Sequence, residues 1–302
     1  MEHSDANWGG TDGHKSGYVT LVGRPNVGKS TLLNALLGQK LSIVTKKPQT
    51  TRHRVLGILS GDGYQVIFLD TPGVIDPQYG LHRAMMRAVD SAVSDADLLL
   101  FLVDATKPRE DPFMLERLRS RQAILVINKV DLIAQKDVLP LAAHYDEAYD
   151  FKEIVPVSAK TGHNVDRLRE LVVGLMPAGP PYYPPEMISE QPERFFVSEL
   201  IREQIFKQYR QEIPYSTQVN IVAYEARQPP DKDLIDAEIV VERETQKGIL
   251  IGKGGSSLKR LGTYARKEIE DFLGRPVFLR LFVKVRGDWR NREGFLRSFG
   301  YE

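Results

Sequence analysis

The stretch that decides the fold is Gly23-Arg24-Pro25-Asn26-Val27-Gly28-Lys29-Ser30. Residues 18–22 before it form an apolar run typical of a buried strand, and residues 31–37 after it favour a helix. A glycine-rich loop between a strand and a helix matches the Gly-x4-Gly-Lys-Ser/Thr motif, whose backbone N–H groups bind phosphate. The sequence therefore predicts a phosphate site at the first strand–helix junction of an α/β sheet.

Two side chains of this loop suit a nucleoside polyphosphate. Lys29 would reach the β- and γ-phosphates, and the Ser30 hydroxyl would bind Mg²⁺. Gly23 and Gly28 let the backbone approach the phosphates more closely than a side chain would permit. The alternative is an ordinary glycine turn. The residues expected around the nucleotide here are Gly23, Asn26, Val27, Gly28, Lys29, Ser30 and Thr31.

A second short motif, Asp70-Thr71-Pro72-Gly73, follows the strand-like run 65–69. The Asp70 carboxylate, at the end of a strand, can hold Mg²⁺ through water, and Gly73 can turn its N–H toward the γ-phosphate. The same four residues are also typical of a plain turn. This motif therefore indicates a nucleotide site only because it follows the phosphate loop along the chain.

Two later strand ends carry residues that suit a guanine base. Asn128-Lys129-Val130-Asp131 follows the buried run 123–127, and Ser158-Ala159-Lys160 follows the run 154–157. The Asp131 carboxylate can accept hydrogen bonds from the N1–H and 2-amino groups of guanine, a donor pair that adenine lacks. The alkyl stem of Lys129 can cover the base, and a backbone N–H of 158–160 can donate to the guanine O6. Because ligands of open α/β sheets bind at the carboxyl ends of strands, these motifs together predict a guanine-nucleotide site.

On these motifs, residues 17–177 resemble the translation-factor-related family of P-loop GTPases. The resemblance implies a doubly wound α/β sheet, a GTP-hydrolysing activity, and guanine selection by Asn128 and Asp131. It also implies that Mg²⁺ is held by Ser30 and a threonine of a switch loop. Thr51 is the expected ligand because related bacterial proteins carry Thr-Thr-Arg and use the second threonine, and Thr50 is the alternative.

Four residues are expected to act in hydrolysis: Lys29, Thr51, Gly73 and Asn26. Val74 stands where many GTPases place a glutamine that orients the attacking water, so slow intrinsic turnover is expected. In related GTPases an asparagine at the position of Asn26 holds K⁺ against the phosphates, which would add positive charge where charge develops in the transition state. The alternative for Asn26 is that it only stabilises the loop.

Composition limits the remaining possibilities. The chain has 302 residues and no cysteine, which excludes disulfides and thiol catalysis and fits a cytoplasmic protein. No apolar run approaches the length needed to span a bilayer, and the polar start is predicted to be a disordered extension over 1–16 rather than a secretory signal. Residues 245–302 carry 13 Lys+Arg against 6 Asp+Glu, whereas the rest of the chain is net acidic. This asymmetry favours a polyanionic partner at the C-terminal end, although basic residues can also simply solubilise a small domain.

A proline-rich connector over 178–193 is expected to separate two domains, because prolines cannot continue a helix or a central strand. Beyond it, the periodicity predicts a helix, two strands, a glycine-rich loop, a long helix and a last strand over 194–302. The loop is Gly252-Lys253-Gly254-Gly255. Its setting resembles the type II KH module, a small α+β fold that clamps about four nucleotides of single-stranded nucleic acid.

The expected RNA contacts are Gly252, Lys253, Gly254, Gly255, Ser256 and Lys259. Glycines let the backbone approach phosphates closely, and Lys253 together with the N–H groups of the following helix meets their charge. The basic tail 286–297 carries Trp289 and Phe295, which suit base stacking. The tail could equally pack back on the module, and an α+β domain with an innocent glycine loop is the alternative for the whole region.

A GTPase module followed by a KH module resembles the Era family of GTPases, over nearly the whole chain except the first 16 residues. That resemblance implies binding of the 3′ end of small-subunit 16S ribosomal RNA, a role in assembling the 30S subunit, and weak peripheral contact with the membrane. A monomer is expected. The alternatives are a plain RNA-binding assembly factor with a relic nucleotide site, or a metabolic P-loop ATPase or kinase with an accessory domain.

Overall fold

The computed structural model describes residues 13–108, 112–118, 121–228 and 230–301. These residues divide into two compact units. Within the described residues, the first unit comprises 13–42, 51–75 and 86–190, and the second comprises 43–50, 76–85 and 191–301. Each unit is described by itself.

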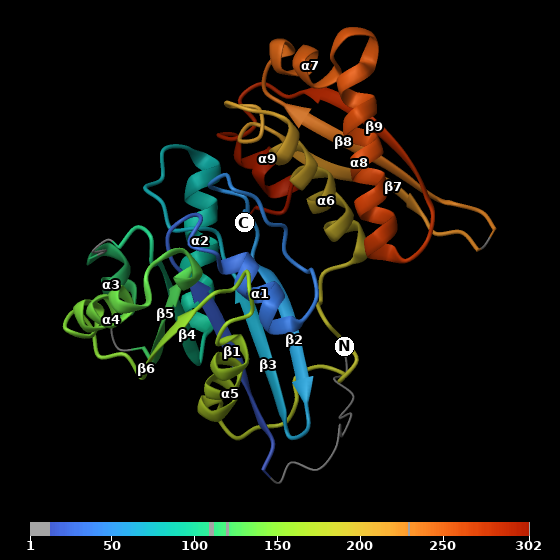
Figure 1. Cartoon of the computed structure of the whole chain (residues 1–302). Helices are drawn as coiled ribbons and strands as arrows, with labels where there is room; N and C mark the ends of the chain where they lie inside the picture. The colour runs from blue at the N-terminus through green and yellow to red at the C-terminus, as the bar shows by residue number, and fades with distance from the viewer. Residues whose placement is uncertain (1–12, 109–111, 119–120, 229, 302) are drawn as a thin grey trace. The chain divides into compact units, whose positions relative to one another are not determined.

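The first unit is built on a six-stranded sheet with the order β2-β3-β1-β4-β5-β6 (Figure 1). β2 runs antiparallel to β3, and the other neighbouring strands are parallel. The strands are β1 (Lys15–Val22), β2 (Val55–Gly61), β3 (Tyr64–Asp70), β4 (Leu98–Asp104), β5 (Ala123–Asn128) and β6 (Glu153–Val157). The connecting helices are α1 (Lys29–Leu37), α2 (Gly80–Asp95), α3 (Pro112–Leu118), α4 (Val138–Asp146) and α5 (Val165–Leu175), with short 3₁₀ turns η1 (Val130–Leu132) and η2 (Gln135–Asp137). The start of α2, up to Met85, belongs to the second unit.

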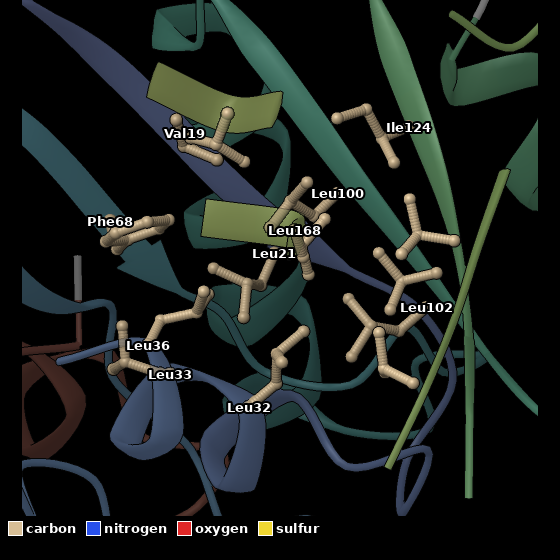
Figure 2. Packing of buried hydrophobic residues seen from close by; sticks show 14 of the residues in the cluster. Val19, Leu21, Leu32, Leu33, Leu36, Phe68, Leu100, Leu102, Ile124 and Leu168 are labelled. Carbon is tan, nitrogen blue, oxygen red and sulfur yellow. The ribbon is translucent and has the colours of Figure 1, made fainter. Parts of the chain in front are cut away.

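Apolar side chains cover both faces of this sheet, as expected for a doubly wound fold. Figure 2 shows one face, where Leu32, Leu33 and Leu36 of α1 and Leu168 of α5 pack on side chains of β1, β3, β4 and β5. Ile67 and Leu69 alternate with Val66 and Phe68 along β3 and pack on the other face, where Ala92 of α2 meets them. The prediction of an α/β doubly wound sheet is confirmed.

The chain enters the sheet earlier than the sequence indicates. Residues 1–12 of the expected extension lie outside the described residues, but Lys15 and Ser16 are the first two residues of β1. Lys15 N–H donates to the Gly63 carbonyl at 2.9 Å, and Ser16 N–H donates to the Pro177 carbonyl at 3.0 Å. The prediction of disorder was therefore wrong at these two residues, because backbone pairing holds a polar segment in place.

The second unit contains a three-stranded sheet of order β7-β8-β9. β7 and β8 are antiparallel, and β8 and β9 are parallel. The elements are α6 (Glu193–Gln208), β7 (Gln218–Glu225), β8 (Asp233–Val241), α7 (Glu244–Ile251), the 3₁₀ turn η3 (Lys253–Gly255), α8 (Ser256–Leu273), β9 (Val277–Val285) and α9 (Glu293–Ser298). Their apolar side chains form one core, in which Leu261, Ala265 and Ile269 of α8 repeat at helical spacing. The order of elements confirms the predicted α+β module.

Candidate nucleotide site and glycine-loop site

The phosphate loop joins β1 to α1 in a conformation that glycine makes possible. Gly28 precedes α1 with φ 103°, in the left-handed region. A Cβ on Gly23 would lie 2.5 Å from the Leu102 carbonyl oxygen, so a side chain there would collide with the backbone of β4. Asn26 also has a positive φ of 65°. Gly28 therefore has a backbone conformation that favours glycine, and Gly23 has no room for a side chain.

Lys29 is buried at the start of α1 and points back into its own loop. Its Nζ donates to the Gly23 carbonyl at 3.0 Å and to the Arg24 carbonyl at 3.1 Å. Burial lowers the pKa of Lys29 to about 8, and the negative charge of Asp70 only partly offsets this. An anion in the loop would stabilise the charged ammonium and raise this pKa.

Three oxygen-bearing side chains meet beside Lys29. The Ser30 hydroxyl donates to Asp70 Oδ2 at 2.7 Å and lies 2.8 Å from Thr51 Oγ1, which is 3.4 Å from the same Asp70 oxygen. Asp70 Oδ1 is buried with no hydrogen-bond partner among the described residues. Burial raises the pKa of Asp70, while Lys29 acts in the opposite direction. Hard oxygen donors around an unsatisfied carboxylate oxygen fit the needs of Mg²⁺.

The neighbouring threonine is held differently. Thr50 Oγ1 donates to the Lys47 carbonyl at 2.8 Å and lies 2.6 Å from Thr45 Oγ1, so its hydroxyl serves the turn of its own segment. Of the two threonines left open by the sequence, Thr51 is the one whose hydroxyl meets Ser30 and Asp70.

Gly73 approaches the phosphate loop closely. A Cβ at this position would lie 2.7 Å from Pro25 Cα, and the next residue, Val74, donates its N–H to the Gly23 carbonyl at 3.1 Å. Val74 is fully buried and carries no polar group. The segment after Asp70 is therefore packed directly on the phosphate loop, with no side chain at 74 that could orient a water.

Asn128 ties the strand-end loops together. Its Nδ2 donates to the Val27 carbonyl at 2.8 Å, and its Oδ1 accepts from the N–H groups of Lys129 at 2.8 Å and Ala159 at 3.0 Å. The side chain is almost completely buried. Asn128 thus connects the phosphate loop to both predicted guanine motifs.

Lys129 and Asp104 form a second connection. Lys129 Nζ donates to Asp104 Oδ2 at 2.5 Å and to the Asn26 carbonyl at 2.6 Å. Burial opposes ionisation of Asp104, but hydrogen bonds from Lys129 and Thr106 hold its pKa below the ordinary value. Sequence reasoning missed Asp104, although it ends the apolar run of β4 as Asp70 ends that of β3.

The remaining guanine candidates lie near this connection along the chain. Asp131 and Lys160 are exposed, and Ser158 is buried with its hydroxyl accepting the Thr161 N–H at 3.2 Å. The Asp131 carboxylate makes no hydrogen bond or ion pair with the other described residues.

In the second unit, the glycine loop leads directly into the start of α8. Gly252, Gly254 and Gly255 have φ values of 72°, 58° and 79°, all in the left-handed region. A Cβ on Gly252 would lie 2.6 Å from the Ser257 hydroxyl oxygen, whereas Gly254 has open space around it. Lys253, Ser256 and Lys259 are exposed around this loop. The six predicted RNA contacts therefore lie on adjoining residues of one loop and the first turn of one helix.

The C-terminal tail packs back on the module. Trp289 is fully buried, and its Nε1–H donates to the Ser216 carbonyl at 2.9 Å. Its ring contacts those of Phe299 and Tyr301. Trp289 is therefore a core residue, and the interpretation of this side chain as a base-stacking group was wrong.

Comparison with known proteins identifies the family. Residues 18–129 match the model of the 50S ribosome-binding GTPase family, and residues 212–290 match that of the KH domain. GTPase Era from Geobacter sp. (strain M21) is 47% identical over 292 residues, which cover 95% of this chain and 98% of the relative. The chain belongs to the Era family of GTPases. The chloroplastic GTPase ERA1 of Zea mays is 50% identical over 295 residues, covering 95% of this chain and 71% of that protein.

Two solved structures of Era agree with the fold. A variant of Aquifex aeolicus Era bound to GDP and AlF4⁻ is 43% identical, with a TM-score of 0.91 over 95% of this chain and 99% of that one. Era in complex with MgGDPNP and nucleotides 1506–1542 of 16S ribosomal RNA is 42% identical, with the same TM-score and coverage. As a member of the Era family, the protein is a GTPase that binds guanine nucleotides. Among the described residues, no helix combines the length and apolarity that a membrane span requires.

Proposed function

We propose that this chain binds the 3′ end of 16S ribosomal RNA through its KH module and acts in assembly of the 30S subunit under control of its GTPase module. The assignment takes 17–177 as the GTPase domain, to which Lys15 and Ser16 of β1 are added, 178–193 as the connector and 194–302 as the KH domain. The observation that carries the RNA proposal is the loop Gly252-Lys253-Gly254-Gly255, which exposes a lysine and a tightly turned backbone at the start of α8. Support also comes from the Era complex that contains nucleotides 1506–1542 of that RNA.

In the GTPase module, we assign phosphate contacts to Lys29 and the backbone of the phosphate loop. Ser30, Thr51 and Asp70 would hold Mg²⁺, which when bound neutralises charge on the phosphates. Asp131 would select guanine, with Asn128 keeping the loops around the base in register. Asn26 is the candidate ligand for K⁺.

Hydrolysis would then depend on contacts from backbone N–H groups and from Lys29 more than on a side chain that acts as a general base. Gly73 would donate its N–H to the γ-phosphate, and Lys29 would stabilise the charge that develops there. Because Val74 supplies no polar group, slow turnover in the absence of RNA is expected. Nucleotide and RNA affinities would be coupled, with RNA binding more tightly to the GTP-bound form.

Fluorescence anisotropy with a labelled RNA of the 16S 3′ terminus tests the RNA proposal. Gly254→Asp adds a carboxylate where phosphate is expected, and we predict at least about a tenfold loss of affinity. Gly274→Asp is a matched control at the other end of α8, because Gly274 has φ 67° and nothing within 4 Å of an added Cβ. Unchanged affinity in the first variant, or equal losses in both, would exclude the glycine loop as the RNA site.

A further inference from the structure

The segment 76–85 is held by the C-terminal tail of the second unit. Leu81 N–H donates to the Arg290 carbonyl at 2.7 Å, and Gly80 N–H donates to Asn291 Oδ1 at 3.0 Å. A Cβ on Gly80 would lie 2.7 Å from the same Arg290 oxygen, so the two backbones touch. This segment begins three residues after Gly73, the glycine expected at the γ-phosphate.

The side chain of Arg290 makes two further contacts. Its guanidinium donates to Glu242 Oε2 at 2.6 Å, and it lies 4.6 Å from the centre of the Tyr79 ring. Both partners of the ion pair are largely buried, with side chains 18% and 10% exposed. Removing one partner of such a pair leaves the other charge buried without compensation, which is strongly unfavourable. Each of the two groups therefore stabilises the native position of the other.

Through Tyr79, contacts lead from Arg290 to segment 43–50. Tyr79 stacks on His82 with ring centres 3.7 Å apart, and His82 Nε2 lies 3.1 Å from Gln49 Oε1. Gln49 is two residues before Thr51 along the chain. The two segments that flank the expected nucleotide contacts, 43–50 and 76–85, are therefore joined to each other and to Arg290 within one unit.

Glu242 leads to the glycine loop. It follows the last residue of β8, and its N–H, together with that of Arg243, donates to Gln246 Oε1 at 2.9 and 3.0 Å. These bonds fix the first turn of α7, whose last residue, Ile251, precedes Gly252. A shift of Glu242 therefore acts on the helix that ends at the proposed RNA contacts.

We propose that Arg290 is a positioning residue that couples segment 76–85 to helix α7, so that the nucleotide bound and the RNA bound each change the affinity for the other through it. The inference rests on the proposed function, since it presumes RNA at the Gly252–Gly255 loop. Coupling between two sites is reciprocal, and it requires an element whose contacts differ between states. Arg290 contacts Tyr79 and Leu81 of segment 76–85 and the Glu242 carboxylate just before α7, so a nucleotide-dependent shift of that segment would change the contacts of Arg290.

The test measures the ratio of RNA affinities in the presence of GDPNP and GDP, with the full chain and the labelled 16S 3′-terminal RNA. Arg290→Met removes the charge and the fork but keeps an apolar stem, and Glu242→Gln removes only the charge of the partner. In both we expect the affinity ratio to fall toward one, with GTP turnover without RNA within about twofold of the parent. Arg290→Lys should give an affinity ratio between those of the parent and Arg290→Met, because a lysine keeps the charge but not the planar guanidinium.

Arg280→Met is the matched control. Arg280 of β9 forms an ion pair with Asp236 of β8 at 2.6 Å and is about half exposed. Among the described residues it has no hydrogen bond or ion pair with segment 76–85 or with Glu242. The control should keep the parent ratio. A parent ratio retained in Glu242→Gln and Arg290→Met would overturn the role of Arg290 and leave the proposed function intact. Absence of RNA binding in the parent chain would instead refute the proposed function itself.

Discussion

At the scale of single residues, Lys29 gives the nucleotide site a pH dependence. Burial lowers its pKa to about 8, and a bound phosphate would raise that value. Affinity for GDP should therefore not change with pH through the titration of Lys29 at pH values below about 7, where its ammonium is charged in both the free and the bound protein. Above about 8 it should fall by up to about tenfold per pH unit, because binding must then recover a proton.

Calorimetry of GDP binding across pH 6–10 measures this effect. Lys29→Arg is the informative variant, since a guanidinium stays charged over the whole range. The variant should bind GDP more weakly, but its affinity should not show the additional decrease above pH 8 that the titration of Lys29 causes. An identical slope in both proteins would assign the titration to another group.

Thr51 and Thr50 offer a second test at this scale. Thr51→Val removes the hydroxyl that meets Ser30 and Asp70, and we expect GTP turnover to fall at least about tenfold, a cost of about 1.4 kcal/mol in the barrier. The Mg²⁺ concentration needed for half-maximal turnover should rise. Thr50→Val removes a hydroxyl whose partners among the described residues, Thr45 and Lys47, lie in its own turn, and it should leave that Mg²⁺ dependence unchanged.

At the scale of elements, the strands whose ends carry the nucleotide motifs were predictable. A run of apolar residues followed by a conspicuous polar motif marks β1, β3, β5 and β6, because parallel strands are buried on both faces. The glycine loop and α8 were predictable for a similar reason, since Leu261, Ala265 and Ile269 repeat at helical spacing. The role of Asn128 in linking three loops was not predictable, because its partners lie 31 and 101 residues away.

Trp289 shows where a local pattern misleads. An aromatic residue among arginines is typical of a nucleic-acid contact, but here the indole fills a core and its N–H binds the Ser216 carbonyl. Trp289→Phe should lower the free energy of unfolding by about 1–2 kcal/mol, because it leaves that carbonyl unsatisfied and a gap beside it. Urea denaturation measures the change.

The control for this variant is an exposed aromatic. Phe282→Leu changes a side chain on β9 that is 46% exposed and should alter stability by less than about 0.5 kcal/mol. RNA affinity should survive Trp289→Phe at temperatures where the protein is folded. A loss of RNA binding without a loss of stability would instead indicate that Trp289 contacts RNA.

At the scale of the whole molecule, the division into units is the result that the sequence could not supply. The segments 43–50 and 76–85 come from the N-terminal half, yet they belong to the unit that contains the KH module. Lys47 Nζ binds the carbonyls of Phe206 and Tyr209 at the end of α6, and Gly80 binds Asn291, contacts that span 159–211 residues of sequence. No periodicity or short motif encodes partners so far apart.

This division gives the proposed coupling a physical route. The segments that follow the phosphate loop and the Asp70–Gly73 motif along the chain are packed on elements of the KH module, so nucleotide binding that reorders them must alter contacts there. Thermodynamic linkage then requires RNA to change nucleotide affinity by the factor with which nucleotide changes RNA affinity.

The most direct measurement is calorimetry of GDPNP and GDP binding to the full chain in Mg²⁺, with and without saturating 16S 3′-terminal RNA. We predict that RNA tightens GDPNP binding by at least about fivefold relative to its effect on GDP, and that this factor equals the one measured for RNA affinity. Affinities for both nucleotides that RNA leaves unchanged, in a chain that binds the RNA, would contradict the account.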